Sequence, residues 1–145
     1  MINGTDNPAF LAYAVTCVVL SLNLLFLWSY SGVVRGRTKT AMNAEDSARF
    51  NVPMTAEDPP EVARVLRAYN NAQACIYPFL LLGLVFVLAG GPAQAAIPIF
   101  AVFTVARLLH SFVYLAGKQP WRTVTFVVGG LATLVLMAEI IWMVA

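Results

Sequence analysis

The chain has 145 residues, of which 60% are apolar and 11% charged, and its formal net charge is +2. Soluble domains carry about 25% charged residues, and a chain of this size cannot enclose so large an apolar excess in one core. The composition therefore excludes a soluble globular domain and predicts an integral membrane protein. The small net charge, without basic clusters interleaved with aromatic residues, excludes a nucleic-acid-binding protein.

Four apolar stretches are each long enough to supply the roughly 20 helical residues that cross a hydrocarbon core. Proline stands at or beside the start of each stretch, and glycine ends the second and third, which is typical of helix termini. We therefore predict an all-α integral membrane protein, a single domain over residues 1–145 that forms a four-transmembrane-helix bundle. The predicted spans cover about residues 8–34, 60–89, 92–117 and 121–145, and a polar connection covers residues 35–60.

The basic residues gather in the first and third connections. Arg35, Arg37, Lys39 and Arg49 lie in the first, Lys118 lies in the third, and the second connection is uncharged. By the positive-inside rule, the first and third connections are cytoplasmic and both termini lie on the opposite side of the membrane. The sequence leaves two membranes open, a bacterial inner membrane and the endoplasmic reticulum.

Polar side chains also occur inside the spans, near the predicted cytoplasmic boundary. A polar group within a membrane helix costs a few kcal/mol unless it faces protein or water, so each is a candidate functional residue. Together they would offer guanidinium, amide, imidazole and hydroxyl groups to a small anionic ligand with peptide-like groups. The alternative is structural, with arginines that extend to the interface and amides that bond neighbouring helices. The candidates are Arg67, Asn70, Asn71 and Gln73 on the second helix, Arg107, His110, Ser111 and Tyr114 on the third, and Arg122 and Thr123 on the fourth.

Cys17 and Cys75 stand far apart in separate apolar runs. This spacing is not typical of a metal site or of a redox pair. We therefore expect no metal ligands and two thiols that pack as small apolar residues. The two cysteines therefore give no indication of function.

Two motifs carry a resemblance to a known family. The first is Arg67-Ala68-x-x-Asn71 followed by Tyr77-Pro78-Phe79-Leu80, and the second is Arg107-x-x-His110-x-x-x-Tyr114-Leu115 followed by Arg122-Thr123-Val124-Thr125. Their spacing resembles that of the MAPEG family (membrane-associated proteins in eicosanoid and glutathione metabolism), above all the branch that contains prostaglandin E synthase and its bacterial relatives. The resemblance covers nearly the whole chain, because the first connection fits it as well, with Gly32, Arg35, Asn43 and Glu45-Asp46 in the same order.

The resemblance implies a homotrimer that binds glutathione between its subunits and acts as a transferase, peroxidase or isomerase on lipophilic electrophiles. It implies that Arg122 stands beside the glutathione thiol and favours the thiolate, with the Thr123 hydroxyl and the acid Asp46 close by. A lipophilic co-substrate would reach this thiolate from the lipid bilayer. The implied glutathione contacts are Arg35, Asn71, His110, Tyr114, Arg122 and Thr123. To these we add Asn70 and Gln73, whose amides lie beside Asn71 in the sequence, as expected glutathione contacts.

Two positions depart from the family pattern. Ala74 stands where the family has a glutamate, and Asn70 stands where the prostaglandin synthase branch has an arginine. Each loss removes a charge-assisted contact of about 1.5–3 kcal/mol. Gln73 or Asn70 would substitute only in part, because neither restores the charge. Two alternatives therefore stay open. One is a non-catalytic family member that binds a lipid or a partner membrane protein, and the other is an enzyme that uses a different low-molecular-weight thiol.

Overall fold

A computed structural model describes residues 7–145 of the chain. Four of its helices are long and apolar enough to cross a membrane. This confirms the prediction of an all-α chain with four helices that can span a bilayer, and it adds one short helix in the first connection. The helices are α1 (Pro8–Thr38), α2 (Ala44–Phe50), α3 (Pro60–Leu88), α4 (Ala93–Leu115) and α5 (Trp121–Val144).

The first helix is longer than the predicted span. It begins where the Asn7 side chain accepts a hydrogen bond from the Ala9 backbone nitrogen at 3.0 Å, and it ends at Lys39, whose φ of 50° is left-handed. The predicted span ended at residue 34, at the last apolar residue. The helix continues for one more turn because Arg35 and Arg37 are favourable near the negative end of the helix dipole.

The polar connection is folded rather than extended. Asn43 caps α2 by accepting a hydrogen bond from the Asp46 backbone nitrogen at 2.8 Å. A short parallel bridge pairs Ala41 with Met54, and Arg35 forms an ion pair with Asp58. These contacts hold the first connection, which includes α2, against the C-terminal end of α1.

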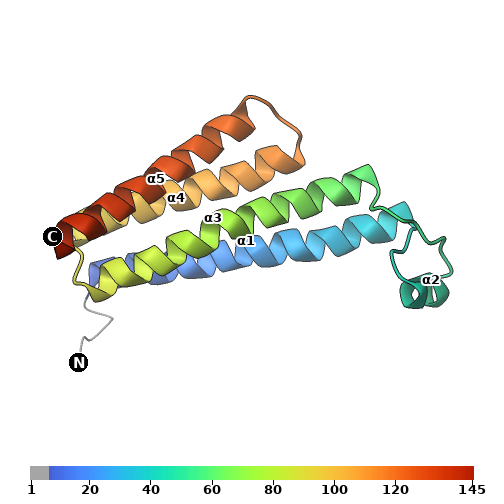
Figure 1. The fold of residues 1–145 in the computed structure, drawn as a ribbon, viewed down its shortest axis with the longest axis horizontal. Coiled ribbons are helices and arrows are strands. Elements are labelled where there is room, and N and C mark those ends of the chain that lie inside the picture. The colour runs from blue at the N-terminus through green and yellow to red at the C-terminus, as the bar shows by residue number, and fades with distance from the viewer. Residues whose placement is uncertain (1–6) are drawn as a thin grey trace.

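The long helices form two antiparallel pairs that pack against each other (Figure 1). The pair α1–α3 lies beside the pair α4–α5, and α1 also packs along α4. The two helices of the first pair have 31 and 29 residues, whereas α4 and α5 have 23 and 24. The α4–α5 turn therefore lies on the same side as α2 but stops short of the ends of α1 and α3, and the C-terminus lies at the opposite end (Figure 1).

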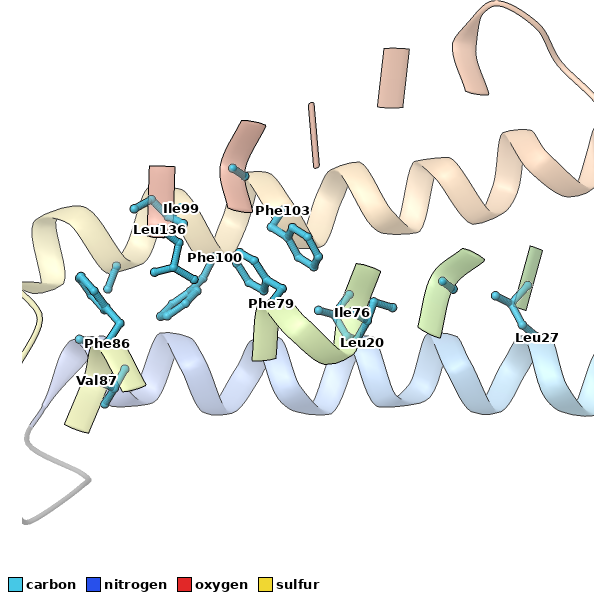
Figure 2. Packing of buried hydrophobic residues seen from close by; sticks show 14 of the residues in the cluster. Leu20, Leu27, Ile76, Phe79, Phe86, Val87, Ile99, Phe100, Phe103 and Leu136 are labelled. Atoms are coloured by element: carbon cyan, nitrogen blue, oxygen red, sulfur yellow. The ribbon is translucent and has the colours of Figure 1, made fainter. Parts of the chain in front are cut away.

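Aromatic side chains fill the centre of the bundle (Figure 2). The rings of Phe79 on α3 and Phe103 on α4 are stacked with centroids 3.5 Å apart. Phe100 lies edge-on to both Phe79 and Phe86, at 5.8 and 6.4 Å. The outward sides of the helices are also apolar, with side chains such as Leu11, Val18, Leu22, Leu131 and Trp142 exposed, as expected for surfaces that face lipid.

The position of α1 against α3 and α4 is fixed by close packing at a glycine and by a side-chain hydrogen bond. A Cβ atom placed on Gly83 of α3 would lie 3.1 Å from ring atoms of both Tyr13 and Phe100, so only glycine fits there without displacing a ring. Further along α1, the Asn23 amide donates to the Ser111 hydroxyl at 3.0 Å across to α4. Small residues and side-chain hydrogen bonds of this kind are the usual means of joining helices in lipid.

Replacing Gly83 with leucine should therefore destabilise the bundle by about 1–3 kcal/mol, the usual cost of overpacking. The measurement is thermal unfolding of the purified protein in detergent. Gly130→Leu is the matched control, since a Cβ at Gly130 meets no atom within 4 Å and since both changes alter helix propensity equally. Equal melting temperatures for the two variants would contradict the close packing at Gly83.

Candidate functional site

The buried arginine of α4 links α4 to α3. The Arg107 side chain is 1% exposed, and its Nη2 donates a hydrogen bond to Asn71 Oδ1 of α3 at 2.8 Å. Its methylene chain lies against α5, where a Cβ on Gly129 would come 3.3 Å from Arg107 Cδ. Within residues 7–145, the Nε and Nη1 atoms of this guanidinium have no hydrogen-bond partner.

One helical turn later, His110 links α4 to α5. Its Nδ1 lies 3.0 Å from the backbone oxygen of Arg122 and 3.1 Å from the hydroxyl oxygen of Thr125. Because a carbonyl oxygen can only accept, Nδ1 carries the proton and donates it. The other ring nitrogen, Nε2, is therefore an acceptor, and it is buried without a partner among the described residues.

The first turn of α5 places a second guanidinium at the same end of the bundle. The Arg122 Cζ atom lies 4.8 Å from the centre of the Tyr114 ring, in a cation–π contact. The Gln119 carboxamide satisfies both of its neighbours when its oxygen accepts from Arg122 Nη2 at 2.7 Å and its nitrogen donates to Thr123 Oγ1 at 3.2 Å. Arg122 is thus held from two sides while it remains half-buried.

These residues form one continuous group, which we call the polar cluster. Two of its members are cations, and the ion pair of the described residues lies elsewhere, between Arg35 and Asp58. The polar cluster therefore carries an uncompensated positive charge, which favours an anionic ligand. No set of three or more potential metal ligands lies close together in residues 7–145. The members of the polar cluster are Asn71, Arg107, His110, Tyr114, Gln119, Arg122 and Thr125.

Two of the candidate residues from the sequence analysis lie outside the polar cluster. Arg35 is paired with Asp58, and Asp46 accepts a hydrogen bond from the Asn43 amide at 3.0 Å in the first turn of α2. Arg35 and Asp46 line the same hollow of about 550 Å³ between α2 and the end of α1. Within one subunit Asp46 is thus a neighbour of Arg35 and not of Arg122, the arginine beside which the resemblance had placed it.

Of the other proposed contacts, Asn70 and Gln73 lie outside the polar cluster, and Thr123 lies at its exposed edge. Asn70 is exposed, and Gln73 donates a hydrogen bond to the Tyr77 hydroxyl at 2.8 Å, one turn further along α3. Tyr77 lines a hollow of about 520 Å³ between α1 and α3, together with Trp28. Thr123 is exposed beside Gln119. One chain therefore assembles Asn71, His110, Tyr114 and Arg122 and leaves the other proposed contacts at its surface.

The sequence analysis did not identify three residues that belong to the polar cluster or pack against it. Gln119 comes from the short α4–α5 turn, where periodicity gives no information. Thr125 follows Arg122 by three residues and Gly129 follows Thr125 by four, so all three lie on one face of α5. This helical spacing could have predicted that Thr125 and Gly129 lie on the same side of α5 as Arg122, which is the side that faces α4.

The fold and the polar cluster define a small helical membrane protein with a cationic site at the end of its bundle that carries most of the basic residues. The chain belongs to the MAPEG family, whose model matches residues 13–142. This match agrees with the resemblance of the Arg107–His110–Tyr114 motif, and it places the polar cluster within the region that the family shares.

Curated relatives cover almost the full chain. Prostaglandin E synthase of Homo sapiens is 34% identical over 138 residues, which are 94% of this chain and 91% of the relative. Microsomal glutathione S-transferase 1 of Rattus norvegicus is 33% identical over 129 residues, or 86% and 83% of the two chains. Both relatives are named as enzymes, one of them as a glutathione transferase, so the chain belongs to a glutathione-related family of membrane enzymes.

Asn71→Ala should destabilise the protein without any ligand, because it leaves a buried guanidinium without its hydrogen-bond acceptor. We expect a loss of about 1–3 kcal/mol, the usual cost of an unsatisfied buried group. The neighbouring Asn70→Ala is the matched control and should change stability by no more than about 0.5 kcal/mol, since Asn70 is exposed. The comparison uses thermal unfolding in detergent, and an equal effect of both changes would argue against the Asn71–Arg107 contact.

Proposed function

We propose that the protein is a glutathione-dependent membrane enzyme, of the transferase, peroxidase or isomerase type, that acts on lipophilic electrophiles. The observation that carries the proposal is the position of Arg122, whose guanidinium lies over the Tyr114 ring and is tied to Gln119. A cation held at a fixed place favours the deprotonated form of a thiol beside it. Arg122 would therefore stabilise the reactive thiolate, as the family membership also suggests.

The donors of the polar cluster fit the chemistry of glutathione, an anionic tripeptide that would supply the nucleophilic thiol. Its carboxylates need cations, and its amides need both donors and acceptors. Arg122 offers charge and Asn71 an amide, and the buried His110 Nε2 is an acceptor without a partner in residues 7–145. The uncompensated charge of the cluster is of the right sign for such a ligand, and Thr123 adds a hydroxyl at its exposed edge.

A homotrimer would complete this site. Arg35 of α1 and Asp46 of α2 line one hollow. Asn70 is exposed and Gln73 bonds to Tyr77, so neither joins the contact between Asn71 and Arg107. These residues can contribute to glutathione binding only if a neighbouring subunit brings them next to the polar cluster. We therefore propose that residues 1–145 form a single four-helix transmembrane domain that assembles as a homotrimer, with each site shared by two subunits.

The proposed reaction takes place at the cytoplasmic boundary of a bacterial inner membrane or the endoplasmic reticulum. The first and third connections, which hold most of the basic residues, would face the cytoplasm, and both termini would lie on the opposite side. A lipophilic co-substrate would arrive from the bilayer. An apolar hollow of about 360 Å³ between α4 and α5, lined by residues such as Val102, Val128 and Leu131, is suited to such a molecule.

A second candidate function is favoured by one observation. Ala74 is exposed on α3, one turn beyond Asn70 and Asn71, where the family pattern has a glutamate. A subunit that lacks this carboxylate loses an acceptor for a cationic group of the ligand. This loss favours a non-catalytic member that binds a lipid or a partner membrane protein, or an enzyme that uses a different small thiol.

Arg122→Ala should lower the rate of conjugation of glutathione to an aromatic halide by about 100-fold, as removal of one charge-stabilising donor does in other enzymes. The thiolate absorbance that appears when glutathione is added to the wild-type protein should disappear as well. Lys118→Ala is the matched control, because it removes a nearby exposed cation outside the polar cluster. Wild-type turnover in the Arg122 variant would refute the proposed role.

Ala74→Glu should tighten glutathione binding by about tenfold or more, since a charge-assisted hydrogen bond contributes about 1.5–3 kcal/mol. Ala74→Gln has nearly the same shape without the charge and serves as the control. The affinity is read from the rise in melting temperature as glutathione is added. If both variants bind as the wild type does, the alanine is not what limits glutathione binding.

A further inference from the structure

A hollow of about 550 Å³ lies where α1 and α3 extend past the α4–α5 turn (Figure 1). The end of α1 and the start of α3 line it, and Leu115, the last residue of α4, also borders it. Its volume lies within the usual range for ligand sites, about 300–1,000 Å³. It shares no residue with the polar cluster and is therefore a separate candidate site.

The wall of this hollow is apolar on the side that continues into the membrane. Val34 and Val65 belong to a buried apolar cluster, and Tyr30 and Leu115 pack against it. The Tyr30 ring also stacks on that of Phe26, one helical turn deeper in the span, with centroids 5.7 Å apart. Because Phe26 is exposed, an apolar surface runs from the hollow to the side of α1 that faces outward.

The rim of the hollow is charged. Arg37 of α1 and Arg64 of α3 both line it and are both exposed. Arg64 extends across to the α4–α5 turn, where a Cβ on Gly117 would lie 3.2 Å from its Nη1 atom. Glu61 is the acid among the lining residues, and the ion pair within residues 7–145 forms elsewhere. Two guanidinium groups and one carboxylate therefore leave the rim with one net positive charge.

We propose that this hollow binds an anionic phospholipid, with the phosphate between Arg37 and Arg64 and an acyl chain along Tyr30 and Phe26. The planar guanidinium of arginine matches the geometry of a phosphate group. Basic pockets between membrane helices bind anionic lipid headgroups in other proteins. A phospholipid uses both parts of the hollow, whereas a soluble phosphate compound would leave the apolar wall uncovered.

A phospholipid in this position would contact three parts of the bundle at once. The end of α1, the start of α3 and the side chain that reaches the α4–α5 turn all border the hollow. A ligand that binds only the folded protein stabilises it in proportion to its occupancy. The bound lipid would therefore raise the melting temperature. It would do so without glutathione, so the proposal does not depend on the proposed enzymatic function.

The first test is thermal unfolding of the purified full chain in an uncharged detergent, without glutathione, while lipid is added. Dioleoyl phosphatidylglycerol should reach half-maximal stabilisation at a concentration at least about tenfold lower than dioleoyl phosphatidylcholine, which has the same chains without the net charge. Glycerol 3-phosphate, the headgroup without chains, should not stabilise at these concentrations. Equal responses to the two lipids would overturn the proposal, as would a response to glycerol 3-phosphate as strong as that to the anionic lipid.

Substitution of the two arginines locates the site. The double variant Arg37→Gln with Arg64→Gln should bind phosphatidylglycerol about 25-fold more weakly, because each arginine near an anionic headgroup contributes about fivefold. The matched control is Arg49→Gln with Lys118→Gln, which removes two exposed cations outside the hollow and should keep the wild-type affinity. Equal losses in the two double variants would show attraction by the overall charge alone and would refute the assignment of the hollow.

A third variant tests the same site by a gain of affinity, which loss of folding cannot produce. Glu61→Gln removes the carboxylate at the rim and should tighten phosphatidylglycerol binding by about fivefold, the effect of one charge near the headgroup. Glu45→Gln is its control, since Glu45 is an exposed acid of α2 that does not line the hollow. An unchanged affinity in the Glu61 variant, or an equal gain in both variants, would contradict the proposed position of the headgroup.

Discussion

The arrangement of this protein depends on how a charged side chain is accommodated inside a bundle that lipid surrounds. Arg107 is buried between α3, α4 and α5, and Asn71 is its hydrogen-bond acceptor. Because an interior without water offers no substitute for this acceptor, the bond ties the register of α3 to that of α4. The next turn of α4 brings His110 to the backbone of Arg122, and this contact places the start of α5. Two adjacent turns of α4 thus position α3 and α5 relative to α4. They also position Arg122, the cation proposed to act on a thiol.

The remaining stability comes from close packing, since apolar side chains gain little by leaving lipid for another helix. The stacked rings of Phe79 and Phe103, and the approach of Tyr13 and Phe100 to Gly83, fill the interior of the bundle. Polar contacts such as Asn23–Ser111 join α1 to α4. The centre of the bundle is therefore filled mainly by aromatic rings, whereas the end near α2 carries the polar cluster, with atoms of Arg107 and His110 that have no hydrogen-bond partner in residues 7–145.

The four long helices follow from the sequence because apolar runs of this length have no other stable arrangement in lipid. Helical spacing also indicated that Arg107, His110 and Tyr114 lie on one face, and the structure places them there. The same spacing also separates Gln73 from Asn71. The two lie two residues apart, and each residue turns the helix by about 100°, so the two amides face different neighbours. Spacing could not reveal Gln119, which belongs to a turn, or the Arg35–Asp58 ion pair, which depends on how the first connection folds back.

The claim on which this account rests is that Asn71 and Arg107 are energetically coupled. A double-mutant cycle with Asn71→Ala and Arg107→Met, read by unfolding in the absence of ligands, measures that coupling directly. The account predicts that the two single losses do not add, with a coupling energy of about 1–3 kcal/mol, as for residues in one hydrogen-bond network. Additive losses, within about 0.3 kcal/mol, would show that the two side chains act independently and would contradict the account.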